Sequence, residues 1–166
     1  MAPAAWLTDH AHLLPHGVAL DVACGRGRNA IWLAEQGSRV VAFDRHADAI
    51  HELQATASAR SLPIVAAVTD LESGTPPLGP DTFDIIVVVH YLHRPLFPAL
   101  IAALRPGGLL IYETFTRTQA RRGKPTNPAY LLMEGELERL VQPLEILDSR
   151  EGAFEGRDVA SVVARR

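Results

Sequence analysis

The stretch Ala19–Asp44, ALDVACGRGRNAIWLAEQGSRVVAFD, contains more functional information than any other part of the chain. It predicts an apolar strand, a glycine turn, a helix and a second strand that ends on Asp44. Gly25 and Gly27 lack Cβ atoms, so the backbone can turn sharply and approach a ligand closely. The helix begins near Arg28, and its positive N-terminal end points at the same place. An acid about 20 residues beyond such glycines can accept ribose hydroxyls. The stretch therefore predicts a site for a nucleoside cofactor.

The choice of cofactor depends on Asp21, four residues before Gly25. The glycine spacing satisfies G-x-G-x-x-G/A, which NAD-binding folds also show, and Arg45 could contact a 2′-phosphate. NAD places its pyrophosphate at this turn, where a carboxylate would repel it, whereas S-adenosylmethionine places an ammonium group there. Such an interaction is worth about 1–4 kcal/mol at about 4 Å. Asp21 therefore favours S-adenosylmethionine, although it could instead accept backbone N–H groups of the glycine loop.

Further motifs connect the chain to a known superfamily. The run Asp21–Gly27, DVACGRG, resembles the first motif of class I S-adenosylmethionine-dependent methyltransferases, with Ala23 in place of the first glycine of E/D-x-G-x-G-x-G. Residues 28–34, RNAIWLA, resemble the tellurite-resistance-type branch of small-molecule methyltransferases. The resemblance covers about residues 18 to 115, and its later matches are Phe43-Asp44, Thr69-Asp70-Leu71, Phe83-Asp84 and Leu104–Leu109.

The rest of the chain alternates strands with helices, which is typical of a doubly wound α/β sandwich with helices on both faces. The resemblance implies a Rossmann-like seven-stranded sheet of order 3-2-1-4-5-7-6 with the last strand antiparallel. We expect one domain over residues 1–166, with an N-terminal cap segment over 1–17 and a substrate-side loop over 116–133. Besides the strands at 18–22 and 39–43, we expect strands over 64–68, 85–89, 109–113, 144–148 and 159–164, helices over 47–60, 95–104 and around 137–141, and a loop over 71–82.

The cofactor residues follow from the rule that ligands bind outside the carboxyl ends of the strands. Asp44 is expected to bind the ribose hydroxyls, the alternative being a solvated acid at a strand end. The resemblance implies that Asp70 accepts the adenine amino group and that the Leu71 N–H faces the ring, although Asp70 could simply form a turn. Cys24 is expected to be a small buried residue of the glycine loop. The predicted cofactor-binding set is Asp21, Ala23, Cys24, Gly25, Gly27, Asn29, Asp44, Arg45, Asp70, Leu71 and His90.

The acceptor residues are expected after the fourth and fifth strands. Methyl transfer from a sulfonium needs orientation, and a base matters only if the acceptor must lose a proton. His93 is the candidate base, with a hydrogen-bonded histidine at the start of a helix as the alternative. Tyr91 and Glu113 are the other catalytic candidates, and His90 is assigned to the methionine end of the cofactor.

Two flanking segments complete the predicted site. Residues 119–130, QARRGKPTNPAY, follow the fifth strand and bring a cluster of cations to the substrate-side loop. These charges could attract an anionic acceptor, the alternative being a solvated loop. In the N-terminal cap segment, a short helix is expected to close over the cofactor. The cations are Arg117, Arg121, Arg122 and Lys124, and the helix contains Trp6, His10 and His12.

Composition narrows the function classes. The chain is 48% hydrophobic and 21% charged, so one domain can bury a substantial core. A formal net charge of −3 does not favour a nucleic-acid partner, and the N-terminus does not resemble a signal peptide. Cys24 is the only cysteine, which gives no disulfide or cysteine zinc site and fits the cytoplasm. We expect no metal and no membrane association. The favoured function is methyl transfer to a small molecule; methylation of RNA or protein, an NAD(P)-binding oxidoreductase and a non-catalytic cofactor-binding protein remain alternatives.

Overall fold

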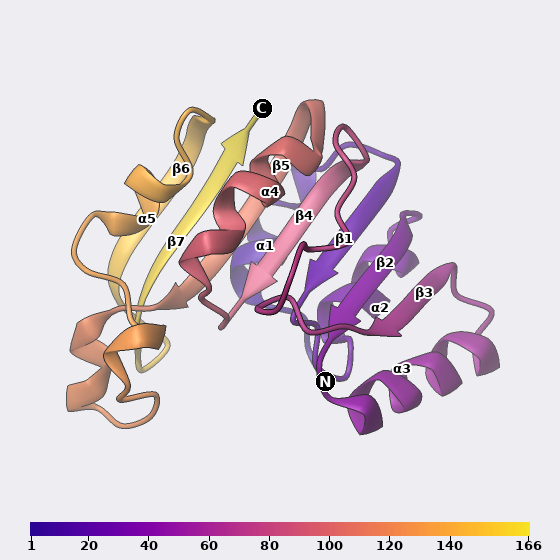
Figure 1. Cartoon of the computed structure of the whole chain (residues 1–166), viewed down its shortest axis with the longest axis horizontal. Helices are drawn as coiled ribbons and strands as arrows, with labels where there is room; N and C mark the ends of the chain where they lie inside the picture. Colours follow the sequence, from indigo (N-terminus) through magenta and orange to yellow (C-terminus); the bar gives the residue numbers. More distant parts are fainter.

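The computed structural model describes all residues, 1–166, and shows one seven-stranded sheet. The strand order is β3-β2-β1-β4-β5-β7-β6, and β7 runs antiparallel to both of its neighbours (Figure 1). The predicted order and the antiparallel strand are therefore confirmed. The strands are β1 Val18–Val22, β2 Arg39–Asp44, β3 Ile64–Val68, β4 Phe83–Val89, β5 Leu104–Phe115, β6 Glu145–Phe154 and β7 Arg157–Arg165.

Helices cover both faces of this sheet, because successive strand residues point to opposite sides. In β4, Ile86 and Val88 pack with residues of α4 and α5, whereas Ile85 and Val87 pack on the other face with residues of α1, α2 and α3. The helices are α1 Ala5–Asp9, α2 Arg28–Glu35, α3 Ala47–Ala59, α4 Phe97–Ala103 and α5 Glu136–Leu140, with 3-10 turns η1 Ala11–Leu13, η2 Arg94–Leu96, η3 Arg117–Arg121 and η4 Pro128–Tyr130. None of these helices has the length and apolar character that a membrane crossing requires.

The segment around β4 and β5 differs in its boundaries from the sequence prediction. The expected helix over 95–104 begins as η2 and ends at Ala103, and β5 begins at Leu104 instead of Leu109. β5 begins early because contacts with distant parts of the chain extend it. Leu104 pairs with Phe83 of β4, and the Gly107 N–H donates to the Arg166 carbonyl at 2.7 Å. The expected loop over 71–82 contains no helix or strand, as predicted.

The N-terminal helix forms, but it packs on the sheet. Trp6 is buried and its indole N–H donates to the Val162 carbonyl of β7 at 3.1 Å. The two ring nitrogens of His10 lie 2.8 Å from the Trp6 carbonyl and 2.8 Å from a carboxylate oxygen of Asp148. A helix is therefore present, but it ends at Asp9, so that of the three predicted residues only Trp6 lies within it. Trp6 contacts β7, His10 contacts β6, and His12 is exposed in η1. None of the three lines the cavity described next.

Candidate active site

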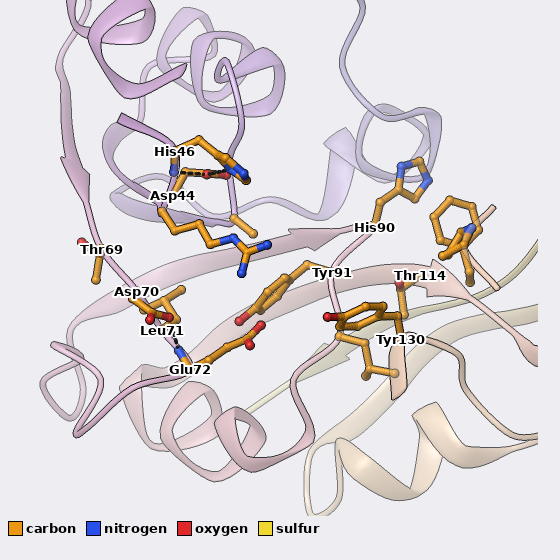
Figure 2. A pocket seen from close by; sticks show the side chains of 15 residues that line it. Asp44, His46, Thr69, Asp70, Leu71, Glu72, His90, Tyr91, Thr114 and Tyr130 are labelled. Carbon is orange, nitrogen blue, oxygen red and sulfur yellow. Dashed lines mark hydrogen bonds and ion pairs between the residues drawn. The ribbon is translucent and has the colours of Figure 1, made fainter. Parts of the chain in front are cut away.

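A cavity of about 320 Å³ opens at the carboxyl ends of the parallel strands. Figure 2 shows Asp44 and His46 at one side, the segment 69–72 at another, and His90, Thr114 and Tyr130 opposite, with Tyr91 between them. The lining residues come from the ends of β1 to β5 and from the segment 116–133: Ala23, Asp44, Arg45, His46, Thr69, Asp70, Leu71, Glu72, His90, Tyr91, Leu92, Thr114, Phe115, Pro125 and Tyr130.

The glycine turn between β1 and α2 contains two glycines in left-handed conformations. Gly25 has φ +55°, and a Cβ placed on it would meet nothing within 4 Å, so one side of this turn is open. Gly27 has φ +81°, but a Cβ there would lie 2.4 Å from the Leu53 side chain of α3. The two glycines thus serve different purposes, because Gly25 leaves room beside the backbone and Gly27 permits helix packing.

Ala23, at the position of the first glycine of the motif, adopts a left-handed conformation that glycine tolerates better. Its φ is +53°, and it lies at the end of β1 where it lines the cavity. A left-handed conformation costs a residue with a Cβ roughly 1–2 kcal/mol. The turn therefore keeps a left-handed residue at this position at an energetic cost.

Asp44 ties the glycine turn to the end of β2. One carboxylate oxygen accepts the Gly25 N–H at 2.8 Å, and the other accepts the His46 N–H at 2.9 Å and lies 2.8 Å from the His46 ring nitrogen. Burial alone would raise the pKa of Asp44, but these hydrogen bonds outweigh it and hold the pKa below its usual range. The carboxylate is therefore charged at neutral pH, and each oxygen can still accept a hydroxyl.

Asp21 is the most buried acid of the site. Its carboxylate accepts the Ala30 N–H in the first turn of α2 at 2.9 Å, so Asp21 does bind backbone, but in the helix and not in the glycine loop that the sequence suggested. Burial raises its pKa to about 7, while the Ala30 hydrogen bond and the Arg28 charge oppose that rise. Asp21 does not line the cavity. Its interaction with an ammonium group stays a prediction.

Two other predicted cofactor residues lie behind the cavity wall. Asn29 is buried, and its side-chain oxygen accepts the Ala4 N–H at 2.9 Å, so it fastens the N-terminal segment to α2. Cys24 is buried, its amide donates to the Phe43 carbonyl at 2.9 Å, and burial raises the pKa of its thiol. Neither lines the cavity, and a nucleophilic role for Cys24 is disfavoured.

The predicted adenine residues do line the cavity. Asp70 is exposed and accepts the Glu72 N–H at 2.9 Å, so it forms the turn after β3 that the sequence left as an alternative. Leu71 is buried and packs into the core. Arg45 lines the same cavity from the end of β2. Turn formation uses one oxygen of Asp70 and leaves the other available.

His90 has an unusual environment at the end of β4. Its φ is +57°, its N–H donates to the Glu113 carbonyl at 2.8 Å, and its ring stacks on Phe115 with centroids 4.5 Å apart. Its Nε2 is buried without a hydrogen-bond partner. Burial and the charges of Arg157 and Arg28 lower the pKa of His90 to about 4, so the imidazole is neutral at physiological pH.

The three predicted catalytic residues separate in the structure. Tyr91 lines the cavity, and burial together with the nearby Glu72 raises its pKa well above the usual range. His93 does not line the cavity and directly precedes η2. The Glu113 carboxylate is also outside the lining and accepts hydrogen bonds from Arg150, at 3.2 Å, and from Ser161. Of the three, only Tyr91 is placed against the cavity.

The segment 116–133 supplies one wall of the cavity, through Pro125 and Tyr130. Of its cations, Arg122 forms an ion pair with Asp158, whereas the other three are exposed and form none.

Sequence reasoning placed this segment near the acceptor but did not assign Pro125 and Tyr130 to the cavity. Six further lining residues were not predicted, although each lies close to a predicted residue near the end of a strand, and this proximity could have identified them. They are His46, Thr69, Glu72, Leu92, Thr114 and Phe115.

The fold and the cavity are those of a nucleoside-cofactor enzyme, and comparison with known sequences identifies its family. Residues 19–108 match the methyltransferase domain family, and the chain belongs to it. The sequence-based assignment to the class I S-adenosylmethionine-dependent methyltransferases is confirmed, and so is the resemblance to the tellurite-resistance-type branch.

Individual relatives agree with this family. The chain is 27% identical over 99 residues to the probable S-adenosyl-L-methionine-dependent methyltransferase TehB of Haemophilus influenzae, covering 60% of this chain and 35% of that protein. It is 32% identical over 106 residues to a protein-L-isoaspartate O-methyltransferase of a Ruegeria species, covering 63% of this chain and 48% of that protein. The chain thus spans between a third and a half of the length of these relatives.

Solved structures share the fold over nearly the whole chain. The crystal structure of TehB from Haemophilus influenzae superposes with a TM-score of 0.81 at 22% identity, covering 99% of this chain and 62% of that one. A methyltransferase from Mesorhizobium loti superposes with a TM-score of 0.77 at 19% identity, covering 98% of both chains.

Proposed function

We propose that this chain transfers a methyl group from S-adenosylmethionine to a small-molecule acceptor. The observation that carries the proposal is the Gly25–Asp44 contact. A turn with one open side is joined at 2.8 Å to a charged carboxylate at the end of the next strand. The open side of the turn leaves space for the amino-acid portion of the cofactor. The carboxylate beside it can accept the two ribose hydroxyls of the adenosine.

The residues present fit this cofactor. Asp44 would hold the ribose hydroxyls, and Asp70 with the Leu71 amide would hold the adenine edge. The open side of Gly25 and the wall at Ala23 would take the amino-acid portion. The cofactor supplies an activated methyl group on a sulfonium. What the chain contributes is orientation of the acceptor and exclusion of water.

A small acceptor is supported by the modest size of the cavity. Its volume of about 320 Å³ has to accommodate the reacting ends of both molecules, and Pro125 and Tyr130 close one side. Arg94 holds this wall in place, because its guanidinium donates to the Leu131 carbonyl at 3.0 Å and to Glu136 at 2.7 Å. A macromolecular acceptor would need a more open approach to the methyl group. Action in the cytoplasm is part of this proposal, since the one free cysteine suits a reducing compartment.

Titration calorimetry with S-adenosylhomocysteine and, separately, NADH tests the cofactor. We expect S-adenosylhomocysteine to bind at micromolar concentration and NADH not to bind. Release of S-adenosylhomocysteine in an acceptor screen tests the activity, with radiolabelled methyl followed into small-molecule, RNA and protein fractions. Label in RNA or protein would contradict the small-molecule proposal, and binding without turnover on any fraction would favour a cofactor-binding protein. Absence of S-adenosylhomocysteine binding would overturn the proposal entirely.

A further inference from the structure

One polar atom of the site lacks a partner within the protein. Nε2 of His90 is buried without a hydrogen bond, although buried ring nitrogens normally find one. The His90 backbone is held in a left-handed conformation, and its ring is stacked on Phe115 of β5. An orphaned atom on a side chain held so firmly indicates that its partner is a ligand.

The position of His90 indicates which ligand that is. The adenosine residues, Asp44 and Asp70, follow β2 and β3, which lie on one side of β1 in the sheet. His90 follows β4 and contacts β5, on the opposite side, and lines the cavity together with Tyr91 and Tyr130. Because the acceptor must approach the methyl group from the side away from the adenosine, this end of the cavity is where it arrives.

The walls of this end suit a particular chemistry. Tyr91, Phe115 and Tyr130 present aromatic rings, and Pro125 adds an apolar ring. Aromatic rings pack well on other rings. No carboxylate pairs with His90, and the charges that act on it are those of Arg157 and Arg28. The imidazole is therefore neutral and can accept a proton.

Given the proposed function, we propose that His90 is a catalytic residue whose Nε2 binds the nucleophilic O–H or S–H group of the acceptor, and that the acceptor carries a small aromatic or apolar body against Tyr91, Phe115 and Tyr130. This role replaces the sequence-based assignment of His90 to the methionine end and of the base to His93.

A weakly basic imidazole at His90 is sufficient to take the proton that the acceptor loses during methyl transfer. A lone pair of the acceptor oxygen or sulfur forms the new bond to the methyl carbon, while the carbon–sulfur bond breaks and its electron pair stays on sulfur. The acceptor proton passes to Nε2 of His90 and then to solvent. An O–H or S–H group becomes strongly acidic as the new bond forms, so a base with a pKa of about 4 is sufficient at that moment. Such a base also stays unprotonated at neutral pH.

Two variants and two probes test this role. His90→Phe keeps the stacking on Phe115 and removes the nitrogen, and His90→Asn tolerates the left-handed backbone. His51→Asn, on the exposed surface of α3, is the matched control. The probes are phenylmethanethiol and phenol, which both keep their proton at pH 7, titrated into the complex with S-adenosylhomocysteine. We expect both His90 variants to bind S-adenosylhomocysteine within about twofold of the parent chain, and to bind the preferred probe at least about 10-fold more weakly. Methylation of that probe should fall by about 10²–10⁴-fold.

The results separate this inference from the proposed function. If the parent chain fails to bind S-adenosylhomocysteine, the proposed function is wrong. If the parent complex binds S-adenosylhomocysteine but neither probe, the acceptor class is wrong. A His90→Phe variant that loses S-adenosylhomocysteine affinity while probe binding is unchanged would place Nε2 on the cofactor and overturn the catalytic role. Probe binding and methylation that are equal in the parent chain and both variants would overturn it as well.

Discussion

The two halves of the cavity are built by different kinds of contact. The cofactor half, around the ends of β1, β2 and β3, is held by short-range backbone geometry: left-handed residues in the glycine turn and the amides that Asp44 accepts. The acceptor half is held by side chains that span the sequence. Arg94 reaches Ala129, Leu131 and Glu136, and Gln119 accepts the Asp158 N–H at 2.8 Å. The comparison teaches that a local motif specifies the first half and long-range pairs specify the second.

Gly25→Val should produce the largest effect, because it changes the backbone of the cofactor half. A β-branched residue at φ +55° is strained by about 1–2 kcal/mol, and its methyl groups would occupy the open side of the turn. We expect S-adenosylhomocysteine affinity to fall at least about 100-fold, roughly 2.7 kcal/mol, as measured by calorimetry.

Gly27→Val is the companion variant to Gly25→Val. Its side chain meets Leu53 and should lower the free energy of unfolding by about 1–3 kcal/mol, as overpacking does. If Gly25→Val folds and binds normally, the turn does not contact the cofactor, and the contrast between the halves disappears.

Asp44→Asn should have the next largest effect. Loss of the charge weakens hydrogen bonds worth about 1.5–3 kcal/mol each, so we expect S-adenosylhomocysteine to bind about 10–100-fold more weakly. Asp70→Asn is the comparison, and its effect should be smaller because Asp70 is exposed and already forms a turn. Equal affinities of Asp44→Asn and the parent chain would place the ribose elsewhere.

Glu136→Gln tests the acceptor half. Glu136 accepts two hydrogen bonds from Arg94 and one from the Met133 N–H, so the variant should lower the free energy of unfolding at pH 7 by about 1–3 kcal/mol. The acceptor KM should rise several-fold while S-adenosylhomocysteine affinity is unchanged. A parallel loss of cofactor affinity would show that the halves are not independent.

The pH dependence of the Glu136 contribution gives a second measurement. Arg94 holds the pKa of Glu136 below its usual range. The stabilisation is therefore complete above the unfolded pKa of about 4.3 and is lost as pH falls through the lower folded value. Urea unfolding curves of the parent chain and Glu136→Gln should differ at pH 7 and converge at strongly acidic pH.

Neutralising Arg117, Arg121 and Lys124 should have the smallest effect. These exposed cations form no ion pair, so their replacement by glutamine should leave folding and cofactor affinity intact. If they attract an anionic acceptor, its KM should rise by about threefold at low salt, and the difference should vanish when salt shortens the screening length below about 8–10 Å. Arg122 is kept, because it pairs with Asp158. A KM insensitive to both changes would identify a solvated loop.

Part of the cofactor half could be predicted from the sequence because its determinants are adjacent in the chain. Glycines at fixed spacing, a helix start and an acid at a strand end are visible in about 25 residues, and Asp44, Arg45, Asp70 and Leu71 all line the cavity. The hydrogen-bond partners of Asp21 and Asn29 could not be identified in this way. Each side chain is satisfied by a backbone amide, of Ala30 and of Ala4, that only the folded chain brings near.

The acceptor half was less predictable for the same reason. His93 is only three residues from His90, yet the backbone after β4 directs one to the cavity and the other to the start of η2. Glu113 lies within the buried strand β5, and its carboxylate pairs with Arg150, 37 residues later. A local sequence pattern does not show that Arg150 pairs with Glu113, nor that Nε2 of His90 has no hydrogen-bond partner.

The docking of α1 on the sheet has a consequence for the order in which the chain can fold. The indole of Trp6 donates to a carbonyl 156 residues further on, in β7. The aromatic face of α1 is therefore covered only after β7 has been synthesised and has joined the sheet. Closure of the N-terminal segment over the sheet is thus complete only once β7 is in place.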